Sequence, residues 1–550
     1  MIRPAIIPGS VFGAPEHIPS VPIVGGNHEG GNGQKHPHTK AVDALENINR
    51  EETEVVDARR DHDGHSQAQI LLRIAQTAKL FHDPAGTPYA DVTLKGHRET
   101  LAVRGKNFKM WLTREFFSVS GAAPNSDALA KAISWAEASA LIDGDERPVF
   151  IRIGHHDGKT YLDLADDVWR AVEITANGWR VVSNPPVRFR RTPGMRPLPA
   201  PQHGGSIDAL RPLVNVKREE DYTLLVAWLI GALAPAGPYP LLAINGEQGS
   251  GKTRLVTLLR NLIDPNAAPT RAMPRDDRNA FISASNSFLQ VFDNLSAVTA
   301  DLSDTLCRIA TGGGFATRAL YTDGDEVLID VARPILLNGI GEVVGRPDLM
   351  DRAINVALAQ IEEGKRRTES ELKADFERSH PLILGALLDA VVVGLRRLPE
   401  VHLTKAPRMA DFARWVSACE PGLWEGEKFL AAYNGNRATA VSDLLDADIV
   451  AAAIRRFMRA RDEWCGTASL LLSALNSQER DKGSRARGWP ELPKTLSDRL
   501  RRLATAMRAN GIDVAFSREG HSRQRLVHLR RASASAPPAP SAEGREGHNA

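Results

Sequence analysis

The residue pattern with the most specific chemistry in this chain is a glycine-rich loop that ends in Lys and Thr. It fits the pattern G-x-x-x-x-G-K-[ST] of a phosphate-binding loop, or P-loop. Glycines let backbone N–H groups close around phosphate oxygens, and a following helix adds the positive end of its dipole. We expect Lys252 to reach the β- and γ-phosphates of ATP and Thr253 to bind Mg²⁺. The loop consists of Gly246, Glu247, Gln248, Gly249, Ser250, Gly251, Lys252 and Thr253.

The segments on both sides of the loop have the patterns that a P-loop requires. Residues 239–245 form a short apolar run typical of a buried strand, and residues 254–263 carry apolar side chains at helical spacing. A further helix is expected before the strand, over residues 221–233. Strand, glycine loop and helix together distinguish a P-loop from a chance glycine-lysine turn, so we predict nucleotide binding here.

A nucleotide-hydrolysing enzyme also needs an acid at the end of a neighbouring strand to hold Mg²⁺. The apolar run of residues 288–292 ends in Asp293, which we predict to be this ligand. An ordinary strand followed by a turn is the alternative, and Asp301 and Asp304 are then the next candidates. The following residue in such sites is often a second acid that polarises the attacking water. Here it is Asn294, so the general base stays unassigned.

A predicted hairpin and a third strand come next in the chain. Residues 316–322 and 326–333 flank an Asp-Gly-Asp turn at residues 323–325, which is a hairpin signal. An apolar strand over residues 334–337 then ends in Asn338, and Arg352 lies beyond it. An arginine in this position can project into the nucleotide site of a neighbouring subunit and stabilise charge in the transition state.

This order of motifs resembles the superfamily 3 helicases within the AAA+ class. It is similar to the ATPase half of phage, plasmid and poxvirus-type primase-helicases. The resemblance implies that Asn338 senses the γ-phosphate, that Arg352 acts on a neighbour's nucleotide, and that the chain forms a homo-oligomeric ring. It also implies that the hairpin reaches into a central pore and grips DNA. The acidic turn departs from the usual basic tip, so Arg318 or Arg333 would have to serve instead.

The segment near the C-terminus has a distinct, basic character. Helices are expected over residues 467–475 and 492–508, and strands over 512–518 and 525–531, which is the order of a winged helix. Residues 480–531 contain 14 Lys and Arg against 5 Asp and Glu, a balance of +9. This excess is expected of a surface that binds DNA phosphates, and a basic solvated face is the alternative. The DNA-binding candidates are Arg318 in the hairpin and Lys494, Arg499, Arg501, Arg502, Arg508, Arg523 and Arg525 in this segment.

The overall composition is that of a soluble globular protein, for which we predict a cytoplasmic location. Of the 550 residues, 42% are hydrophobic and 25% are charged. The three cysteines form no C-x-x-C pair, which argues against zinc and against disulfides. The most apolar window, residues 381–395, is too short to span a bilayer and contains Asp389, so we predict no membrane segment. The scattered histidines of the first 65 residues are more typical of a solvated tail than of a metal site.

We therefore predict an α/β fold built on a P-loop NTPase core of the AAA+ or superfamily 3 type. An α+β domain precedes this core, and a helical lid and a winged-helix module follow it. The expected boundaries are a disordered arm at 1–65, the α+β domain at 66–193, a Pro/Gly linker at 194–206, the ATPase core at 207–362, the helical region at 363–462, the basic winged-helix-like domain at 463–531 and a disordered tail at 532–550.

The leading functional hypothesis is an ATP- and Mg²⁺-dependent motor that acts on DNA, a helicase in the replication of a phage or mobile element. The alternative is an AAA+ regulatory or loader ATPase that remodels a protein partner on DNA. A P-loop kinase is a weaker alternative, because no acceptor site is evident after the loop. Residues 66–193 show no cluster of primase carboxylates, so primer synthesis is not predicted.

Overall fold

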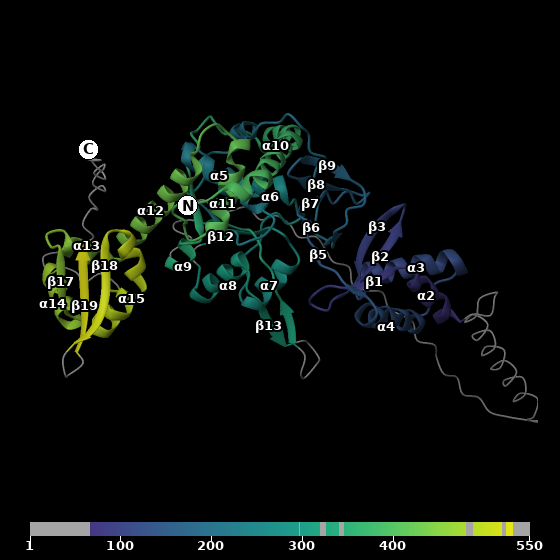
Figure 1. The fold of residues 1–550 in the computed structure, drawn as a ribbon, viewed down its shortest axis with the longest axis horizontal. Helices are drawn as coiled ribbons and strands as arrows, with labels where there is room; N and C mark the ends of the chain where they lie inside the picture. Colours follow the sequence, from purple (N-terminus) through teal and green to yellow (C-terminus); the bar gives the residue numbers. More distant parts are fainter. Residues whose placement is uncertain are drawn as a thin grey trace, which may run out of the picture. The chain divides into compact units, whose positions relative to one another are not determined.

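The structure, a computed structural model, describes residues 66–295, 298–318, 326–339, 346–479, 488–519 and 524–531. Its elements follow the chain as an N-terminal α+β region, a central parallel sheet with helices on both faces, and a C-terminal region of helices and antiparallel strands (Figure 1). None of the described helices is long and apolar enough to cross a bilayer.

The N-terminal region is a four-stranded sheet with helices packed on it. Its strands lie in the order β3-β2-β1-β4, antiparallel except for the parallel pair of β1 and β4. Phe108 and Leu112 of α3 and Ala132 and Ala136 of α4 are buried in its core, where the small alanines allow α4 a close approach to the sheet. The elements are α2 (Gln67–Gln76), β1 (Lys79–His82), β2 (Pro88–Leu94), β3 (His97–Ala102), α3 (Lys106–Ser120), α4 (Ser126–Ile142) and β4 (Asp145–Glu146).

A second sheet follows, and its hydrophobic core is continuous with that of the central region. Strands β6 to β9 form an antiparallel meander, while β5 pairs with β10 in parallel. Leu162, Val172 and Ile174 of the meander belong to the same buried cluster as residues of the central helices α5 (Glu219–Ala232) and α10 (Glu369–Arg397). The elements are β5 (Val149–Phe150), β6 (Ile153–His156), β7 (Lys159–Asp163), β8 (Ala171–Thr175), β9 (Gly178–Val182), β10 (Arg188–Phe189) and the 3-10 helix η1 (Ile207–Leu213).

Residues 194–206, which we predicted to be a linker, form an ordered strap across α10 (Glu369–Arg397). The Gln202 N–H donates to the Pro381 carbonyl at 2.9 Å, and Leu198 is buried in the central core. The strap sits so close to α10 that a Cβ at Gly385 would lie 1.8 Å from the Gln202 carbonyl oxygen. Glycine is therefore required at residue 385. Residues 194–206 belong to the central core, so their Pro/Gly-rich composition does not mark a boundary of that core.

The central sheet is parallel and has the order β12-β15-β11-β16. Its strands are β11 (Leu241–Gly246), β12 (Gln290–Leu295), β15 (Ile335–Gly339) and β16 (Ala353–Leu358). Alternate residues face opposite sides: Leu242 and Ile244 pack with α5 (Glu219–Ala232) and α6 (Lys252–Ile263). Leu241 and Ala243 pack with α7 (Asp277–Ser285) and α8 (Ala300–Thr311). Burial on both faces explains why these strands read as continuous apolar runs.

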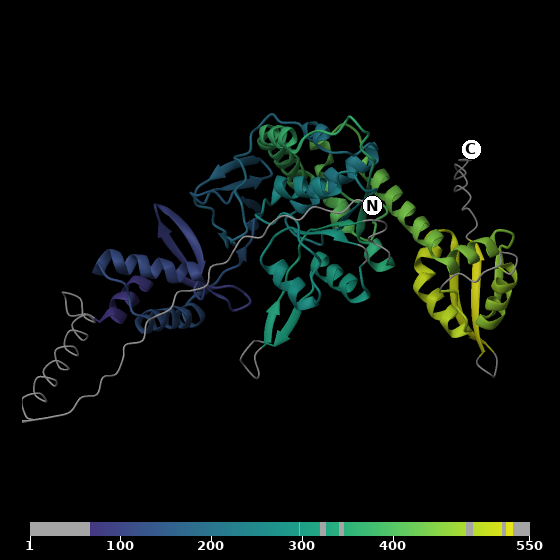
Figure 2. The same cartoon turned by 180° about the vertical axis from the view of Figure 1, so that it is seen from behind.

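A hairpin follows α8 and extends beyond α7 and α8 (Figures 1 and 2). It consists of β13 (Phe315–Arg318) and β14 (Glu326–Ile329), which pair antiparallel. The predicted hairpin is thus present, while its Asp-Gly-Asp turn and the Arg318 side chain lie outside the described part of the chain. Arg333 packs at the base of the hairpin, where its Nε donates to the Ala284 carbonyl at 3.0 Å. The prediction that Arg333 could grip DNA is therefore not supported by its position.

The C-terminal half is mostly helical and ends in a three-stranded sheet of order β17-β19-β18. α10 begins with a capping box between Thr368 and Glu371. α12 joins two cores, since its Tyr433 packs in the central cluster and its Leu445 packs with α13 and α15. The short helix α9 (Pro347–Met350) precedes β16. The elements after α10 are η2 (Leu398–Glu400), α11 (Ala410–Cys419), η3 (Glu420–Gly422), α12 (Phe429–Ala447), α13 (Ile449–Met458), β17 (Glu463–Thr467), α14 (Ala468–Glu479), α15 (Pro493–Ala509), β18 (Ile512–Glu519) and β19 (Gln524–Arg531).

Candidate functional site

The glycine-rich loop connects the carboxyl end of β11 to the first residue of α6. Gly246, Gly249 and Gly251 have φ values of 154°, 81° and 85°, a range that side chains disfavour. A Cβ at Gly246 would also lie 2.9 Å from the Leu358 carbonyl oxygen. The loop therefore needs glycine both for its backbone path and for its close approach to β16.

The Lys252 side chain binds backbone carbonyls at the start of the loop. As the first residue of α6, it folds back so that its Nζ donates to the Gly246 carbonyl at 2.6 Å and to the Glu247 carbonyl at 2.8 Å. The ammonium thus lies over the amino end of a 12-residue helix, within the curve of the loop. Positive charge and free backbone N–H groups at a helix start are the ingredients of an anion site.

Thr253, Asp293 and Asn338 meet beside the loop, although they are far apart in sequence. Thr253 Oγ1 donates to Asp293 Oδ1 at 3.3 Å, and Asn338 Nδ2 lies 3.4 Å from Thr253 Oγ1 and also donates to Asp293. The parallel register causes this meeting, because β15 lies between β12 and β11 and all three strands end at the same edge. Open parallel sheets place ligands at this edge.

This cluster fits Mg²⁺ by the chemistry of its donors. A Thr hydroxyl and one carboxylate are hard oxygen ligands, and Mg²⁺ in nucleotide sites takes its other ligands from water and phosphates. The Oδ1 atom of Asn338 is buried and has no hydrogen-bond partner among the described residues, which leaves an acceptor beside the loop. Asn294 follows with φ 59°, and its N–H donates to Asp293 Oδ1 at 2.8 Å, which holds the carboxylate in place.

A cavity of about 890 Å³ extends from this cluster along the P-loop to the first turns of α10. Its wall includes Lys252, Thr253, Asp293 and Asn338 on one side and Glu369 and Lys373 on the other. Sequence reasoning missed the α10 side of the cavity entirely. The signal available was the basic run of residues 365–367 directly before this helix.

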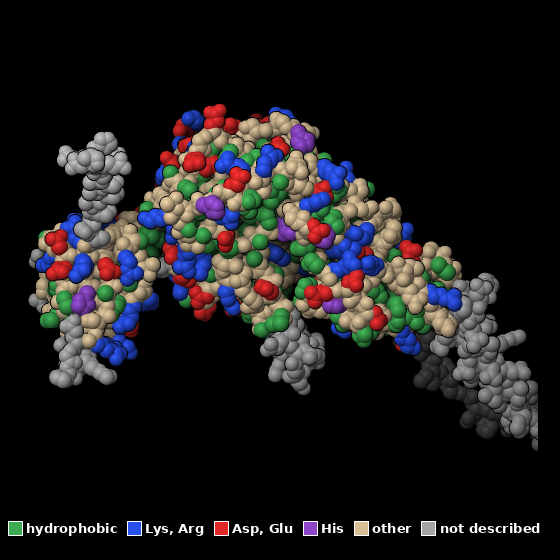
Figure 3. Space-filling view, viewed as in Figure 1, with side chains coloured by type: hydrophobic (Ala, Val, Ile, Leu, Met, Phe, Trp, Pro, Cys, Tyr) green, Lys and Arg blue, Asp and Glu red, His purple; other side chains and the backbone are tan. Residues whose placement is uncertain are grey.

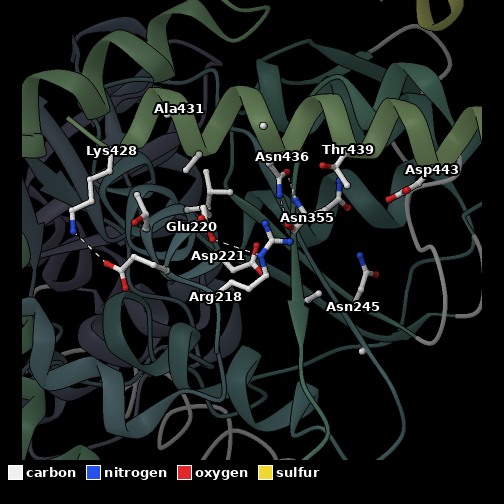
Figure 4. Close-up of a pocket in the computed structure, with 18 of the residues that line it drawn as sticks. Arg218, Glu220, Asp221, Asn245, Asn355, Lys428, Ala431, Asn436, Thr439 and Asp443 are labelled. Carbon is white, nitrogen blue, oxygen red and sulfur yellow. Dashed lines mark hydrogen bonds and ion pairs between the residues drawn. The ribbon is translucent and has the colours of Figure 1, made fainter. Parts of the chain in front are cut away.

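A second cavity, of about 980 Å³, lies on the other side of the loop start, between α5, β16 and α12 (Figure 4). Asn436 of α12 caps the outer edge of β16, since its Oδ1 accepts from the Asn355 N–H at 3.0 Å and its Nδ2 donates to the Asn355 carbonyl at 2.6 Å. The two basic residues of the lining pair with Glu219 and Glu220, whereas Asp221, Glu247 and Asp443 have no ion pair with a described residue. This acidic lining disfavours a triphosphate, so the smaller cavity is the better phosphate site.

Arg352 lies far from the P-loop of its own chain. β16 pairs with β11 from Ala353 opposite Leu241 to Leu358 opposite Gly246, so Arg352 precedes the strand at the opposite end of the sheet. Its Nη1 donates to the Asp348 carbonyl at 2.9 Å. This position excludes a role in its own chain's nucleotide site.

The predicted DNA-binding residues of the C-terminal segment separate into two groups. Lys494, Arg501, Arg502 and Arg525 are exposed and have no ion pair with a described residue. By contrast, Arg499 pairs with Asp448 at 2.9 Å and Arg508 pairs with Asp513 at 2.7 Å, while Arg523 lies outside the described residues.

Sequence reasoning missed Arg518, which lies directly opposite Arg525 across β18 and β19. Like charges in this register destabilise a sheet unless an anion is present. Arg501 of α15 stacks over Phe516, two residues before Arg518, at 4.4 Å from the ring centre. Figure 3 shows Lys and Arg side chains gathered along the lower edge of this module.

Two family models match most of the chain after residue 206. The family described as Actinomycete integrative conjugative element replication protein matches residues 207–447, and the AICE RepA C-terminal domain matches residues 450–542. The first match contains every strand of the central sheet, and the second runs from the second residue of α13 through β19. A search of curated proteins finds no match.

Solved structures with a similar chain path are distant. SCCmec type IV Cch, described as an active helicase, is 12% identical with a TM-score of 0.41, over 82% of this chain and 92% of that chain. The A form apo structure of the NrS-1 C terminal region is 12% identical with a TM-score of 0.36, over 84% of this chain and 98% of that chain. At these values the likeness carries no functional argument.

Proposed function

We propose that the chain is an ATP-hydrolysing motor that acts on DNA. Family models of the replication proteins of actinomycete integrative conjugative elements match residues 207–447 and 450–542, which supports a role in replication. The observation that carries this proposal is the meeting of Thr253, Asp293 and Asn338 beside a P-loop closed by Lys252. In this proposal each of these residues would contribute to the hydrolysis of a nucleoside triphosphate.

In the proposed reaction, the P-loop backbone and Lys252 hold the β- and γ-phosphates. Thr253 and Asp293 would hold Mg²⁺, which when bound neutralises the charge that develops on the phosphate oxygens. Asn338, whose Nδ2 lies against Thr253 and donates to Asp293, has no partner for its Oδ1 among the described residues, so this oxygen could accept a hydrogen bond from the attacking water and orient it. No step of hydrolysis requires a covalent intermediate with the protein.

The C-terminal module supports the DNA part of the proposal. Three helices, α13 to α15, and a three-stranded sheet whose last two strands form a hairpin have the element order of a winged helix. Its exposed arginines, among them Arg501, Arg518 and Arg525, form no ion pair with a described residue and would contact DNA phosphates. We propose that this module binds DNA while the central region hydrolyses ATP.

We further propose that the ATP site is completed by a neighbouring copy of the chain, so that the active form is a ring. Arg352 is remote from its own P-loop, and it is half-buried beside α9, where its Nη1 donates to the Asp348 carbonyl. A guanidinium supplied by a neighbour stabilises transition-state charge in many phosphoryl-transfer enzymes. This role for Arg352 would explain a basic side chain held at the end of the sheet that is opposite to its own site.

The test of the proposal is strand separation with a fluorescent forked DNA duplex in ATP, with Lys252→Ala protein as the control. We expect unwinding by the wild-type protein and none by the variant. ATP hydrolysis without unwinding would favour a loader or switch that remodels a protein partner. Unwinding at the wild-type rate by Lys252→Ala would refute the proposed ATP site.

A further inference from the structure

A basic run, Lys365-Arg366-Arg367, crosses the P-loop between β16 and α10. Its middle residue approaches the loop most closely. A Cβ atom added to Gly249 would lie 3.3 Å from Arg366 Nη2. The guanidinium therefore lies against the loop at the position of this glycine. Nothing in the sequence patterns of the P-loop itself indicates a second cation at this place.

The segment that carries Arg366 is held at both ends, by the P-loop at its start and by α10 at its end. Asn215 Nδ2 donates to the Ser250 carbonyl at 3.0 Å and to the Ala359 carbonyl at 2.5 Å, which ties the loop to the start of the segment. Ile361 Cδ1 lies 3.4 Å from the position of a Cβ on Gly251. At its other end, the segment enters α10 through the Thr368 capping box. Arg366 is thus held over the loop by its chain neighbours and not by contacts of its own.

The three basic residues differ in their ion pairs. Lys365 pairs with Glu362 at 2.7 Å, and Arg367 pairs with Asp375 of α10. Arg366 has neither an ion pair nor a hydrogen bond with any described residue. Two of the three cations are therefore paired with nearby carboxylates, and the third, which has no ion pair with a described residue, is the cation beside the loop.

From this arrangement we infer that Arg366 is a second phosphate-binding cation, which contacts the triphosphate chain of a nucleotide bound in the P-loop of the same subunit. The inference rests on the proposed function, because it requires that the P-loop bind a nucleoside triphosphate. A guanidinium offers several N–H donors in a planar fork that suits phosphate oxygens, which a single ammonium such as Lys252 does not. Arg366 would thereby add to ATP affinity from within the chain, unlike Arg352, which we place in a neighbour's site.

The test is a titration of each protein with a fluorescent ATP analogue and with ADP, at low and at moderate salt. Lys365→Ala is the matched control, because it removes one positive charge from the same exposed segment, and that charge is already paired with Glu362. We expect Arg366→Ala to weaken ATP binding about tenfold or more, and Lys365→Ala to change it less than about twofold. Arg366→Lys should restore part of the loss, and the difference between the two alanine variants should shrink as salt rises.

Arg366 is exposed, so its truncation should leave the thermal unfolding midpoint unchanged, and this is measured alongside. Equal losses in Arg366→Ala and Lys365→Ala would show a general effect of charge and overturn the inference. So would wild-type affinity in Arg366→Ala while Lys252→Ala, titrated in parallel, loses binding. Wild-type affinity in Lys252→Ala itself would instead refute the proposed nucleotide site, so the two failures are distinguishable.

Discussion

Asp264→Asn should be among the most destabilising single substitutions in the central region. Asp264 directly follows α6, and its carboxylate is shared by two buried arginines: Arg152 Nε lies 3.0 Å from Oδ1, and Arg260 Nη2 lies 3.2 Å from Oδ2. Oδ2 also accepts from the Leu289 N–H at 3.0 Å. The side chains of Arg152, Arg260 and Asp264 are at most 2% exposed.

The magnitude follows from this burial. The amide of Asn has nearly the same shape as the carboxylate but no charge, so the substitution leaves two guanidinium groups without a buried counter-ion. Removal of one partner of a buried ion pair costs about 3–5 kcal/mol of the free energy of unfolding. The same substitution at Asp208, whose pair with Arg211 at 2.8 Å is exposed, should cost less than about 1 kcal/mol.

The assay is native-state hydrogen exchange of peptides from α6 and β12, with Asp208→Asn as the matched control. We expect the opening free energy of these peptides to fall by about 3–5 kcal/mol in Asp264→Asn and to stay within about 1 kcal/mol of wild type in the control. Equal protection in the two variants would show that the shared carboxylate does not hold α6 in place.

Further expected outcomes concern the site and the pH dependence of stability. Asp293→Asn should keep most nucleotide affinity but lose hydrolysis, because Mg²⁺ would lose its acidic ligand; a wild-type rate would place that ligand elsewhere. Arg352→Ala mixed with Lys252→Ala should hydrolyse ATP faster than the sum of the separate variants, under conditions where subunits exchange; a purely additive rate would contradict a site shared between subunits. Burial lowers the pKa of His380 to about 4, from an ordinary 6.5, although its bond to the Leu262 carbonyl opposes this shift. Between these two pKa values, His380 is protonated in the unfolded chain but neutral in the folded chain. Protonation therefore favours the unfolded chain as the pH falls, and at pH 5 it should lower the free energy of unfolding by about 2 kcal/mol. Urea unfolding of His380→Gln should show a weaker fall in stability between pH 7 and pH 5, and an identical fall would contradict this reasoning.

Local patterns predicted the elements of the central region well, because their physical causes lie within short stretches of chain. Residues 239–263 were predicted to form strand, glycine loop and helix, and they do so as β11, the loop and α6. A positive φ at Gly249 and Gly251 is a local demand, which only glycine meets easily. The hairpin of β13 and β14 followed in the same way from alternation and turn residues.

Features that depend on contacts between distant segments could not be predicted in this way. The proline-rich strap of residues 194–206 has the composition of a linker, but its fit depends on Gly385, which follows it by almost two hundred residues. Arg152 lies in a run that reads as a strand, and its partner Asp264 is on another element. Arg499 has the same type and sequence neighbourhood as Arg501, yet only the structure shows that Asp448 neutralises it.

The most direct test of the central claim is steady-state ATP turnover with and without single-stranded DNA, measured for the wild-type protein and for Lys252→Ala. We predict turnover by the wild-type protein that rises when DNA is added, and none by the variant in either condition. Turnover by Lys252→Ala at the wild-type rate, or a wild-type protein that hydrolyses no ATP in the presence of Mg²⁺ and DNA, would contradict the account.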